Sequence, residues 1–221
     1  MIKLQDYNKE KQRLSFLTDM STSLANAIRR SVLEIPVMAI DEVEIIKNDS
    51  ALYDEILAHR LGLVPIKTDK TTKEIKFKLK EVGPKIVYSL DIKPDIGTGF
   101  KILLVILDKD QEIEMVCNAR LGKGIEHLKH SPGLAYYKHN IDEEILDFVN
   151  IDENGIISYD EEDLKNKGLS EEKIKKIKSV KEAKELVFNI ESWGQINVKD
   201  IFVKAIEALQ DNLKELNKSV S

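Results

Sequence analysis

The sequence predicts a mixed α+β fold, on two observations. Amphipathic helical patterns lie toward opposite ends of the 221-residue chain, over residues 24–35 and 198–216. Between them, short segments alternate apolar and polar residues with a period of two, as β-strands with one buried face do. Hydrophobic residues make up 42% of the chain, which is enough for one large or two modest cores.

A β-hairpin is expected over residues 1–17, because two alternating runs flank a polar turn at residues 8–10. The helix that follows can be capped by Ser21 or Thr22. Pro36 ends it, since the residue before a proline is pushed away from helical dihedrals. Small and medium-sized residues form its apolar stripe, which suits the close approach of another helix.

The middle of the chain is predicted to be mostly β-strand. The alternating runs cover residues 42–45, 75–79, 88–92, 100–107 and 112–119. One helix interrupts them, with an apolar stripe over residues 52–57. Asp49 or Ser50 is expected to cap this helix, and Gly62 is expected to end it in the left-handed conformation.

Residues 142–180 change in character from acidic to lysine-rich, and residues 168–170 separate two short helical patterns within them. A strand over residues 186–190 and a turn at Trp193 and Gly194 come next. Asn197 then caps the longest predicted helix, whose twenty or so residues span about 30 Å.

Composition excludes several classes of protein. The net charge of −5 argues against broad nucleic-acid binding, because phosphates need clustered positive charge. Cys117 is the single cysteine, so neither an intrachain disulfide nor a cysteine-built zinc or iron–sulfur site can form. The first residues lack the long apolar stretch of a signal peptide, and no segment is apolar enough to span a membrane. A cytoplasmic protein without membrane contact is expected.

The last helix has an unbroken apolar stripe, formed by Val198, Ile201, Phe202, Ala205, Ile206, Leu209, Leu213 and Leu216. One interpretation is that the two long helices pack on each other within the chain. The pattern favours a second interpretation, in which a stripe of this length extends across a partner protein. Burying six to eight such side chains, at about 1.5–3 kcal/mol each, would make that contact obligate.

Two parts of the sequence resemble one protein family. The first is NAIRRSVLEIP at residues 26–36, which runs on through residues 39–43 and 54–65, and the second is ESWGQ at residues 191–195. Together they closely resemble the D-type subunit of archaeal RNA polymerase. They are also similar to the third-largest subunit of eukaryotic polymerase II and, more distantly, to the N-terminal domain of the bacterial alpha subunit. A weaker match covers residues 119–132, and the resemblance fails between residues 140 and 183.

The resemblance implies a discontinuous dimerisation domain, made of residues 1–40 and 176–221, with a β-rich domain inserted over residues 41–175. In this family the two long helices pair with a smaller relative, the L-type subunit. That heterodimer and two small zinc-binding subunits form the platform on which the two large catalytic subunits assemble. Direct contact with nucleic acid is not expected, and the family member has no catalytic site of its own.

Two sets of residues follow as candidate contacts. The interface with the L-type subunit is expected to contain Leu24, Ala27, Ile28, Ser31, Val32, Ile201, Phe202, Ala205, Leu209 and Leu213. Contact with a large subunit is expected at Arg29 and Arg30, where arginine suits a desolvated ion pair, and at His59 and Arg60. The alternatives are a solvated charged face for the two arginines, and a helix-dipole role for His59 and Arg60.

Metal and catalytic sites are not supported. His127, His130 and His139, together with Cys117, match no ligand spacing, and no nucleophile constellation is found. Two glycine pairs, at residues 97–99 and 122–124, are interpreted as turns because they lack the setting of a phosphate loop.

Residues 150–161 have the spacing of an EF-hand calcium loop, with Asn150, Asp152, Asn154 and Glu161 at ligand positions. The alternative, which we favour, is a hairpin that turns at Asn154 and Gly155. Many archaeal relatives carry an iron–sulfur insertion in this region. Residues 142–175 look like a cluster-free replacement, so no cofactor is expected.

The sequence therefore predicts a non-catalytic assembly scaffold of a DNA-directed RNA polymerase, itself a nucleotidyltransferase. Two other classes stay open. They are a free-standing metal-binding enzyme that uses the histidines or the acids of residues 152–161, and a homodimeric structural protein that uses the same two helices.

Overall fold

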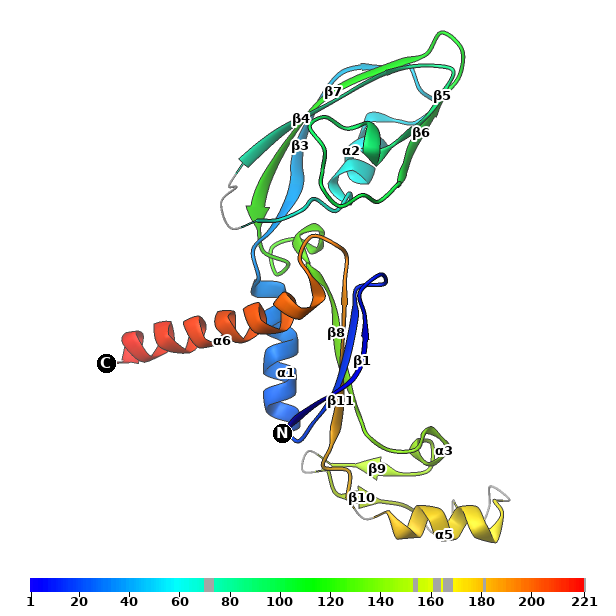
Figure 1. The fold of residues 1–221 in the computed structure, drawn as a ribbon, viewed down its shortest axis with the longest axis vertical. Coiled ribbons are helices and arrows are strands. Elements are labelled where there is room, and N and C mark those ends of the chain that lie inside the picture. The colour runs from blue at the N-terminus through cyan, green and yellow to red at the C-terminus, as the bar shows by residue number, and fades with distance from the viewer. Residues whose placement is uncertain (70–73, 153–154, 161–163, 165–168, 181, 221) are drawn as a thin grey trace. The chain divides into compact units, whose positions relative to one another are not determined.

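The computed structural model describes residues 1–221 except 70–73, 153–154, 161–163, 165–168, 181 and 221. The chain divides into two compact units, each built from two stretches of sequence (Figure 1). The first unit contains residues 1–30 and 135–191, and the second contains residues 31–134 and 192–221. The described strands pair antiparallel and helices are interspersed among them, so the predicted α+β class is confirmed.

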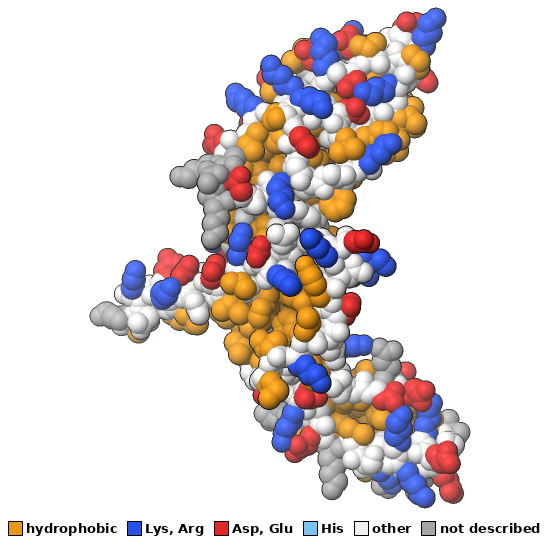
Figure 2. All heavy atoms as spheres, viewed as in Figure 1, with side chains coloured by type: hydrophobic (Ala, Val, Ile, Leu, Met, Phe, Trp, Pro, Cys, Tyr) orange, Lys and Arg blue, Asp and Glu red, His pale blue; other side chains and the backbone are white. Residues whose placement is uncertain are grey.

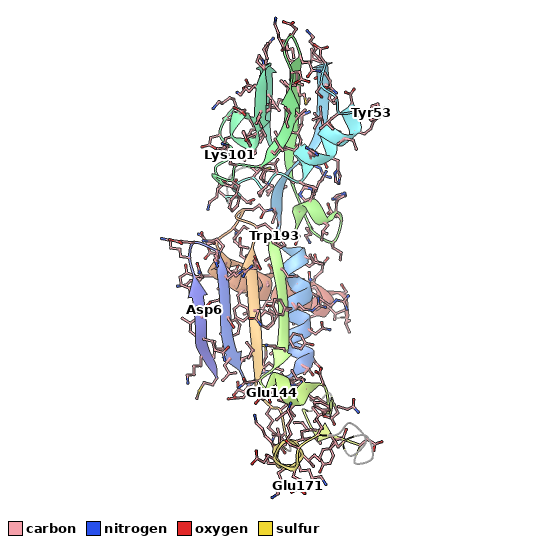
Figure 3. All side chains as sticks on the ribbon, turned by 90° about the vertical axis from the view of Figure 1, so that its right-hand side faces the viewer. Asp6, Tyr53, Lys101, Glu144, Glu171 and Trp193 are labelled. Carbon is pink, nitrogen blue, oxygen red and sulfur yellow. The ribbon has the colours of Figure 1, made fainter. Side chains whose placement is uncertain are left out.

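The first unit is built on a four-stranded sheet with the strand order β1-β2-β11-β8 (Figure 3). These strands are β1 (Ile2–Asn8), β2 (Arg13–Thr18), β8 (Gly133–His139) and β11 (Leu186–Ser192). Phe16 and Phe188 face each other across β2 and β11, with ring centroids 5.5 Å apart. Helix α1 (Thr22–Ser31) covers one face of this sheet and buries Ala25 and Ile28.

A smaller substructure lies between β8 and β11 in the same unit. It consists of α3 (Glu143–Leu146), a two-stranded hairpin of β9 (Asn150–Ile151) and β10 (Ile157–Ser158), and α5 (Glu171–Ser179). Ile145, Leu164 and Ile177 form its own apolar cluster. The Ser170 side chain caps α5 by accepting a hydrogen bond from the backbone of Lys173.

The second unit contains a three-stranded sheet with the order β3-β7-β4 and a two-stranded sheet of β5 and β6. Its elements are β3 (Val37–Asn48), α2 (Asp54–Gly62), β4 (Glu74–Val82), β5 (Lys85–Tyr88), β6 (Leu103–Leu107) and β7 (Glu112–Gly122). Along β7 the odd-numbered residues 113–119 are buried, as the predicted alternation requires. Met115, Phe77 and Leu61 of α2 belong to one continuous core.

The described part of this unit also includes three 3₁₀ turns and the C-terminal helix. The turns are η1 (Val32–Glu34), η2 (Ser89–Asp91) and η3 (Leu128–His130), and the helix is α6 (Val198–Val220). Helix α6 packs against η1 and buries Val198, Ile201 and Ala205. Within the described residues, no helix is both long and apolar enough to cross a membrane.

Several local predictions are wrong. Asp49 and Ser50 do not cap α2, which begins after Tyr53; the carboxylate of Asp49 instead accepts a hydrogen bond from Glu112. Gly62 is not left-handed, because α2 ends through the helical backbone of Leu63. The predicted strand over residues 88–92 ends at Tyr88, where Asp91 accepts from the Tyr88 backbone and closes a 3₁₀ turn.

The boundaries of the two units differ from those expected for the domains. Residues 135–191 cluster with the N-terminal hairpin, and α6 clusters with the β-rich part. The expected division was residues 1–40 with 176–221 against residues 41–175.

Candidate protein-interaction site

Half of the residues expected at the L-type interface are buried within this chain. Ile28, Ser31 and Val32 are each no more than 5% exposed, and Ile201 and Ala205 on α6 are fully buried. Helical periodicity predicts a buried face but does not say which molecule covers it. These five side chains therefore already belong to the chain's own core.

The other expected interface residues remain accessible. Leu24 is 46% exposed and Leu213 is 55% exposed, while Ala27, Phe202 and Leu209 are partly buried. Every described residue of α6 from Asp211 onward is exposed, so the last ten residues of this 23-residue helix have no cover from the rest of the chain.

The apolar stripe continues along this uncovered part of α6. Leu216 is 60% exposed and Val220 is 80% exposed, and both follow Leu209 and Leu213 at three- and four-residue spacing. Figure 2 shows apolar side chains along one side of the helix and charged side chains along the other. The sequence analysis placed Leu216 in the apolar stripe but not among the expected interface residues, and it missed Val220, which the same spacing could have found.

A groove of about 410 Å³ runs beside α6 in the second unit. Ile35, Pro36, Leu121 and Ala208 supply apolar lining, and charged side chains of α6 line it as well. At its edge the ammonium of Lys123 lies 3.0 Å from the carboxylate of Glu34.

The four residues expected to meet a large subunit lie in two places. Arg29 donates two hydrogen bonds to the Asn26 side chain, and Arg30 at the end of α1 is exposed. His59 and Arg60 lie in the last turn of α2, where positive charge favours the helix dipole. Arg60 also donates to the carbonyl of Leu104 at 2.7 Å, which ties α2 to β6.

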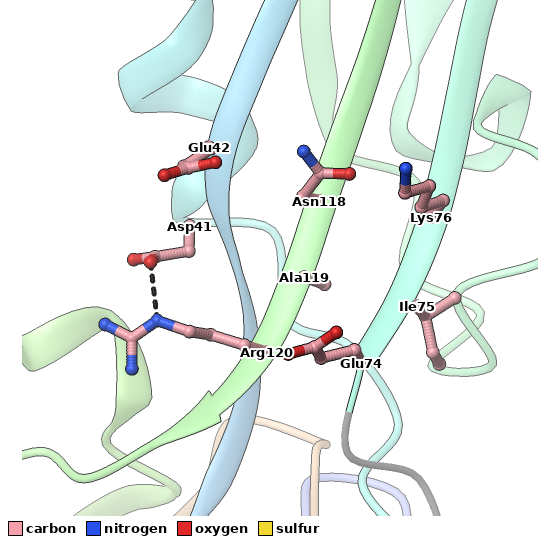
Figure 4. Close-up of a pocket in the computed structure, with 8 residues that line it drawn as sticks. All are labelled: Asp41, Glu42, Glu74, Ile75, Lys76, Asn118, Ala119 and Arg120. Atoms are coloured by element: carbon pink, nitrogen blue, oxygen red, sulfur yellow. Dashed lines mark hydrogen bonds and ion pairs between the residues drawn. The ribbon is translucent and has the colours of Figure 1, made fainter.

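An ion-pair network that the sequence did not predict lies on the β3-β7-β4 sheet. Asp41 accepts a hydrogen bond from Arg120 at 2.5 Å (Figure 4). It accepts a second one from Lys129, also at 2.5 Å. These two hydrogen bonds lower the pKa of Asp41 to about 2. The guanidinium and carboxylate lie beside an open hollow of about 600 Å³ on the outer face of the sheet.

The histidines and the cysteine occupy separate places. His130 is buried, and its Nδ1 lies 2.8 Å from the carbonyl of Val37; burial lowers its pKa. His139 contacts the carbonyl of Ala183, and His127 accepts from the backbone of Lys129. Burial raises the pKa of Cys117 to about 11. Among the residues that the structure describes, no group of three or more His, Cys, Asp or Glu could hold a metal.

The candidate calcium loop contains a hairpin of β9 and β10. Ile157 pairs with Ile151, and the Asp152 carboxylate accepts from the backbone of Ile156 at 2.7 Å. Gly155 has a φ of +77°, which is the left-handed conformation expected in such a turn. Two proposed ligands, Asn154 and Glu161, lie outside the described residues.

Comparison with known proteins identifies relatives over most of the chain. The family model described as the RNA polymerase Rpb3/Rpb11 dimerisation domain matches residues 16–213. The DNA-directed RNA polymerase subunit Rpo3 of Pyrococcus horikoshii is 39% identical over 155 residues, which cover 63% of this chain and 60% of the relative. For several of the relatives, the matched part thus spans about three-fifths of their own length.

Two further relatives are covered more completely. Rpo3 of Methanocaldococcus jannaschii is 41% identical over 156 residues, which cover 67% of this chain and 82% of the relative. Rpo3 of Archaeoglobus fulgidus is 32% identical over 246 aligned positions, which cover 92% of each chain. The similarity therefore extends across both compact units.

Proposed function

The chain belongs to the RNA polymerase Rpb3/Rpb11 dimerisation-domain family, among the archaeal Rpo3 subunits, and from this premise we propose that it is a non-catalytic assembly subunit of a cytoplasmic DNA-directed RNA polymerase. The resemblance to the D-type family, seen in residues 26–65 and 191–195, is confirmed. The proposed role is to pair with an L-type subunit and to offer the large catalytic subunits and two small zinc-binding subunits a composite surface. With Cys117 as its single cysteine, it would hold no cysteine-ligated iron–sulfur cluster.

One observation carries the proposal. Helix α6 begins with residues buried in its own chain and continues, along the same stripe, into Leu213 and Leu216, which are 55% and 60% exposed. An apolar stripe on a helix that leaves its own core is unfavourable in water and is stabilised by a partner. Burying each leucine would contribute about 1.5–3 kcal/mol to association.

Binding of the purified chain to the L-type subunit of the same organism tests the proposal. The double variant Leu213→Asp/Leu216→Asp removes about 3–6 kcal/mol of apolar burial, so its affinity should fall at least about 100-fold. Because both side chains are exposed in the chain alone, its free energy of unfolding should stay within about 0.5 kcal/mol. Sedimentation and urea denaturation measure the two quantities.

A matched control uses the opposite side of the same helix. Lys214→Asp/Lys218→Asp adds more negative charge at exposed positions but leaves the apolar stripe intact, so binding should be retained. Unchanged binding of the leucine variant would contradict the proposed interface. A stable homodimer that excludes the L-type subunit would favour the alternative of a homodimeric structural protein.

A further inference from the structure

We propose that the outer face of the β3-β7-β4 sheet is a docking surface for another protein, which presents acidic side chains to β4 and basic side chains to β3. The surface consists of two rows of side chains across the three strands. These rows are Lys76–Asn118–Glu42 and Lys78–Val116–Glu44. The inference rests on the proposed function in one respect: the partner is sought among the other subunits of the polymerase.

The charges of these rows are sorted by strand. Both lysines lie on the edge strand β4, and both glutamates lie on the opposite edge strand β3. Because neighbouring strands are about 4.8 Å apart, the backbones of the lysine and the glutamate of one row are separated by about 10 Å, with a residue of β7 between them. Within the described part of the chain, neither Lys76, Lys78, Glu42 nor Glu44 forms an ion pair.

Neighbouring charges on the same face are paired instead. Lys80 lies 2.7 Å from Glu114 on the adjacent strand, and Lys47 lies 2.9 Å from Glu112. At the other end, Arg120 pairs with Asp41, next to the exposed Glu74 (Figure 4). The sheet can therefore neutralise opposite charges by cross-strand pairing, and it does so on both sides of the two sorted rows.

Placing like charges on the same strand is electrostatically unfavourable for the chain alone. Like charges two residues apart on one strand lie about 6.7 Å from each other, and they repel without an opposite charge between them. A partner of complementary pattern would remove this repulsion on both edges at once.

The centre of the surface holds an unsatisfied polar group. The side-chain oxygen of Asn118 is buried and has no hydrogen-bond partner. The oxygen points toward Lys76, and the amide nitrogen points toward Glu42 (Figure 4). The amide dipole is therefore aligned with the charges at the two ends of its row. Asn118 lines the open hollow of about 600 Å³, but its side-chain oxygen is covered in the chain alone, so a donor would reach it only after the neighbouring side chains move.

The pattern fits a protein rather than a nucleic acid. Glu42 and Glu44 would repel a phosphate backbone, which needs a continuous positive surface. A separation of about 10 Å between an acidic and a basic group corresponds to seven residues of α-helix. The expected partner segment therefore carries an acid and a base about two helical turns apart, and its binding should weaken as salt screens the charges.

A photo-cross-linker at the centre of the surface tests the inference. Val116→Cys is labelled with a benzophenone maleimide; Cys117 is buried with a raised pKa and reacts poorly in comparison. The labelled chain is assembled with the polymerase subunits of its organism and irradiated. We expect a cross-link to a protein peptide that carries both an acidic and a basic residue. Its yield should fall about fivefold or more between 0.1 and 0.5 M salt.

Charge-reversal variants make the test specific. Lys76→Glu/Lys78→Glu and Glu42→Lys/Glu44→Lys should each reduce the cross-link about fivefold or more, since each replaces attraction by repulsion. The exchange Lys80→Glu/Glu114→Lys on the same face keeps its internal pair and should leave the yield unchanged. Equal yields from all variants would overturn the inference.

Failure of the docking surface can be separated from failure of the proposed function. If the L-type subunit binds but Val116→Cys cross-links to no protein, or only to nucleic acid, the docking surface is overturned and the assembly role stands. If polymerase subunits do not bind the labelled chain at all, the proposed function fails. The docking surface is then overturned as well, because no partner remains in the experiment.

Discussion

Single residues on the β3-β7-β4 sheet show what sequence patterns predict and what they miss. Alternation along β7 correctly separates buried Met115 and Cys117 from their polar neighbours, because it depends on adjacent residues only. The ion pairs of Asp41 with Arg120 and Lys129 could not be predicted, since the partners lie 79 and 88 positions away in the sequence. Pairing at that separation is set by strand register and by the position of η3.

Asp41→Asn should make the chain less stable in a pH-dependent way. The pKa of Asp41 is lowered to about 2 from an ordinary value near 3.8, so the carboxylate stabilises the fold above about pH 4. This contribution is lost as the pH falls through 2. At pH 7 the variant should lose about 1–2 kcal/mol of unfolding free energy, allowing for the half-exposed Arg120. Urea denaturation at pH 7, 4 and 2.5 measures the loss.

The adjacent residue supplies the control for that prediction. Glu42 lies on the same strand but forms no ion pair in the described chain, so Glu42→Gln should change stability by less than about 0.5 kcal/mol at any of these pH values. Equal losses for both variants would mean that general surface charge, rather than the Asp41 network, controls stability.

At the scale of elements, helices with a long stripe are the most predictable. Helix α6 begins after Asn197, as predicted, because the Asn197 carbonyl accepts the first helical hydrogen bonds from Asp200 and Ile201. The start of α2 was not predictable from Asp49 or Ser50, since these residues form a loop that is held by Asn48. Polar residues that can cap a helix can equally close a turn.

The turn before α6 requires glycine for two reasons. Gly194 has a φ of +97°, and a Cβ there would lie 2.4 Å from the ring of Phe100. Gly194→Ala should therefore lower the unfolding free energy by about 2–4 kcal/mol through backbone strain and steric overlap together. Thermal or urea denaturation of the purified chain measures the loss.

A control at Gly99 distinguishes backbone strain from steric overlap. Its φ is +71°, but a Cβ there would meet no atom within 4 Å. Gly99→Ala should therefore cost only the strain of about 1 kcal/mol. If both alanine variants lose the same amount, contact with Phe100 contributes nothing and the close approach is relieved by movement of the ring.

At the scale of the whole molecule, the sequence predicts the α+β class and the family, but not the division into units. Each unit joins two distant stretches of sequence, and periodicity carries no information about which stretches cluster. For the same reason, periodicity could not tell which residues of the helix stripes pack in the chain's own core and which are left for a partner. Ile201 and Leu213 follow one pattern, yet one is buried and the other is 55% exposed.

The segment between β8 and β11 can be tested as a separable substructure. Its own cluster of Ile145, Leu164 and Ile177 gives it a core distinct from the four-stranded sheet. At its base, the backbone nitrogen of Asn140 donates to the carbonyl of Glu185 at 2.8 Å, so the two chain ends lie side by side. A two-residue turn can join ends at that spacing.

Replacement of residues 141–184 by Asn-Gly should therefore leave the four-stranded sheet folded and L-type binding intact. The expected loss of unfolding free energy is about 1–2 kcal/mol, because the hydrogen bond from His139 to Ala183 disappears. Urea denaturation and sedimentation with the L-type subunit measure both. In the full chain, Ile177→Asp places a charge in the small cluster and should raise hydrogen exchange in α3 and α5 but not in β11. Faster exchange in β11, or failure of the shortened chain to fold, would show that this segment belongs to the core of the four-stranded sheet and is not separable.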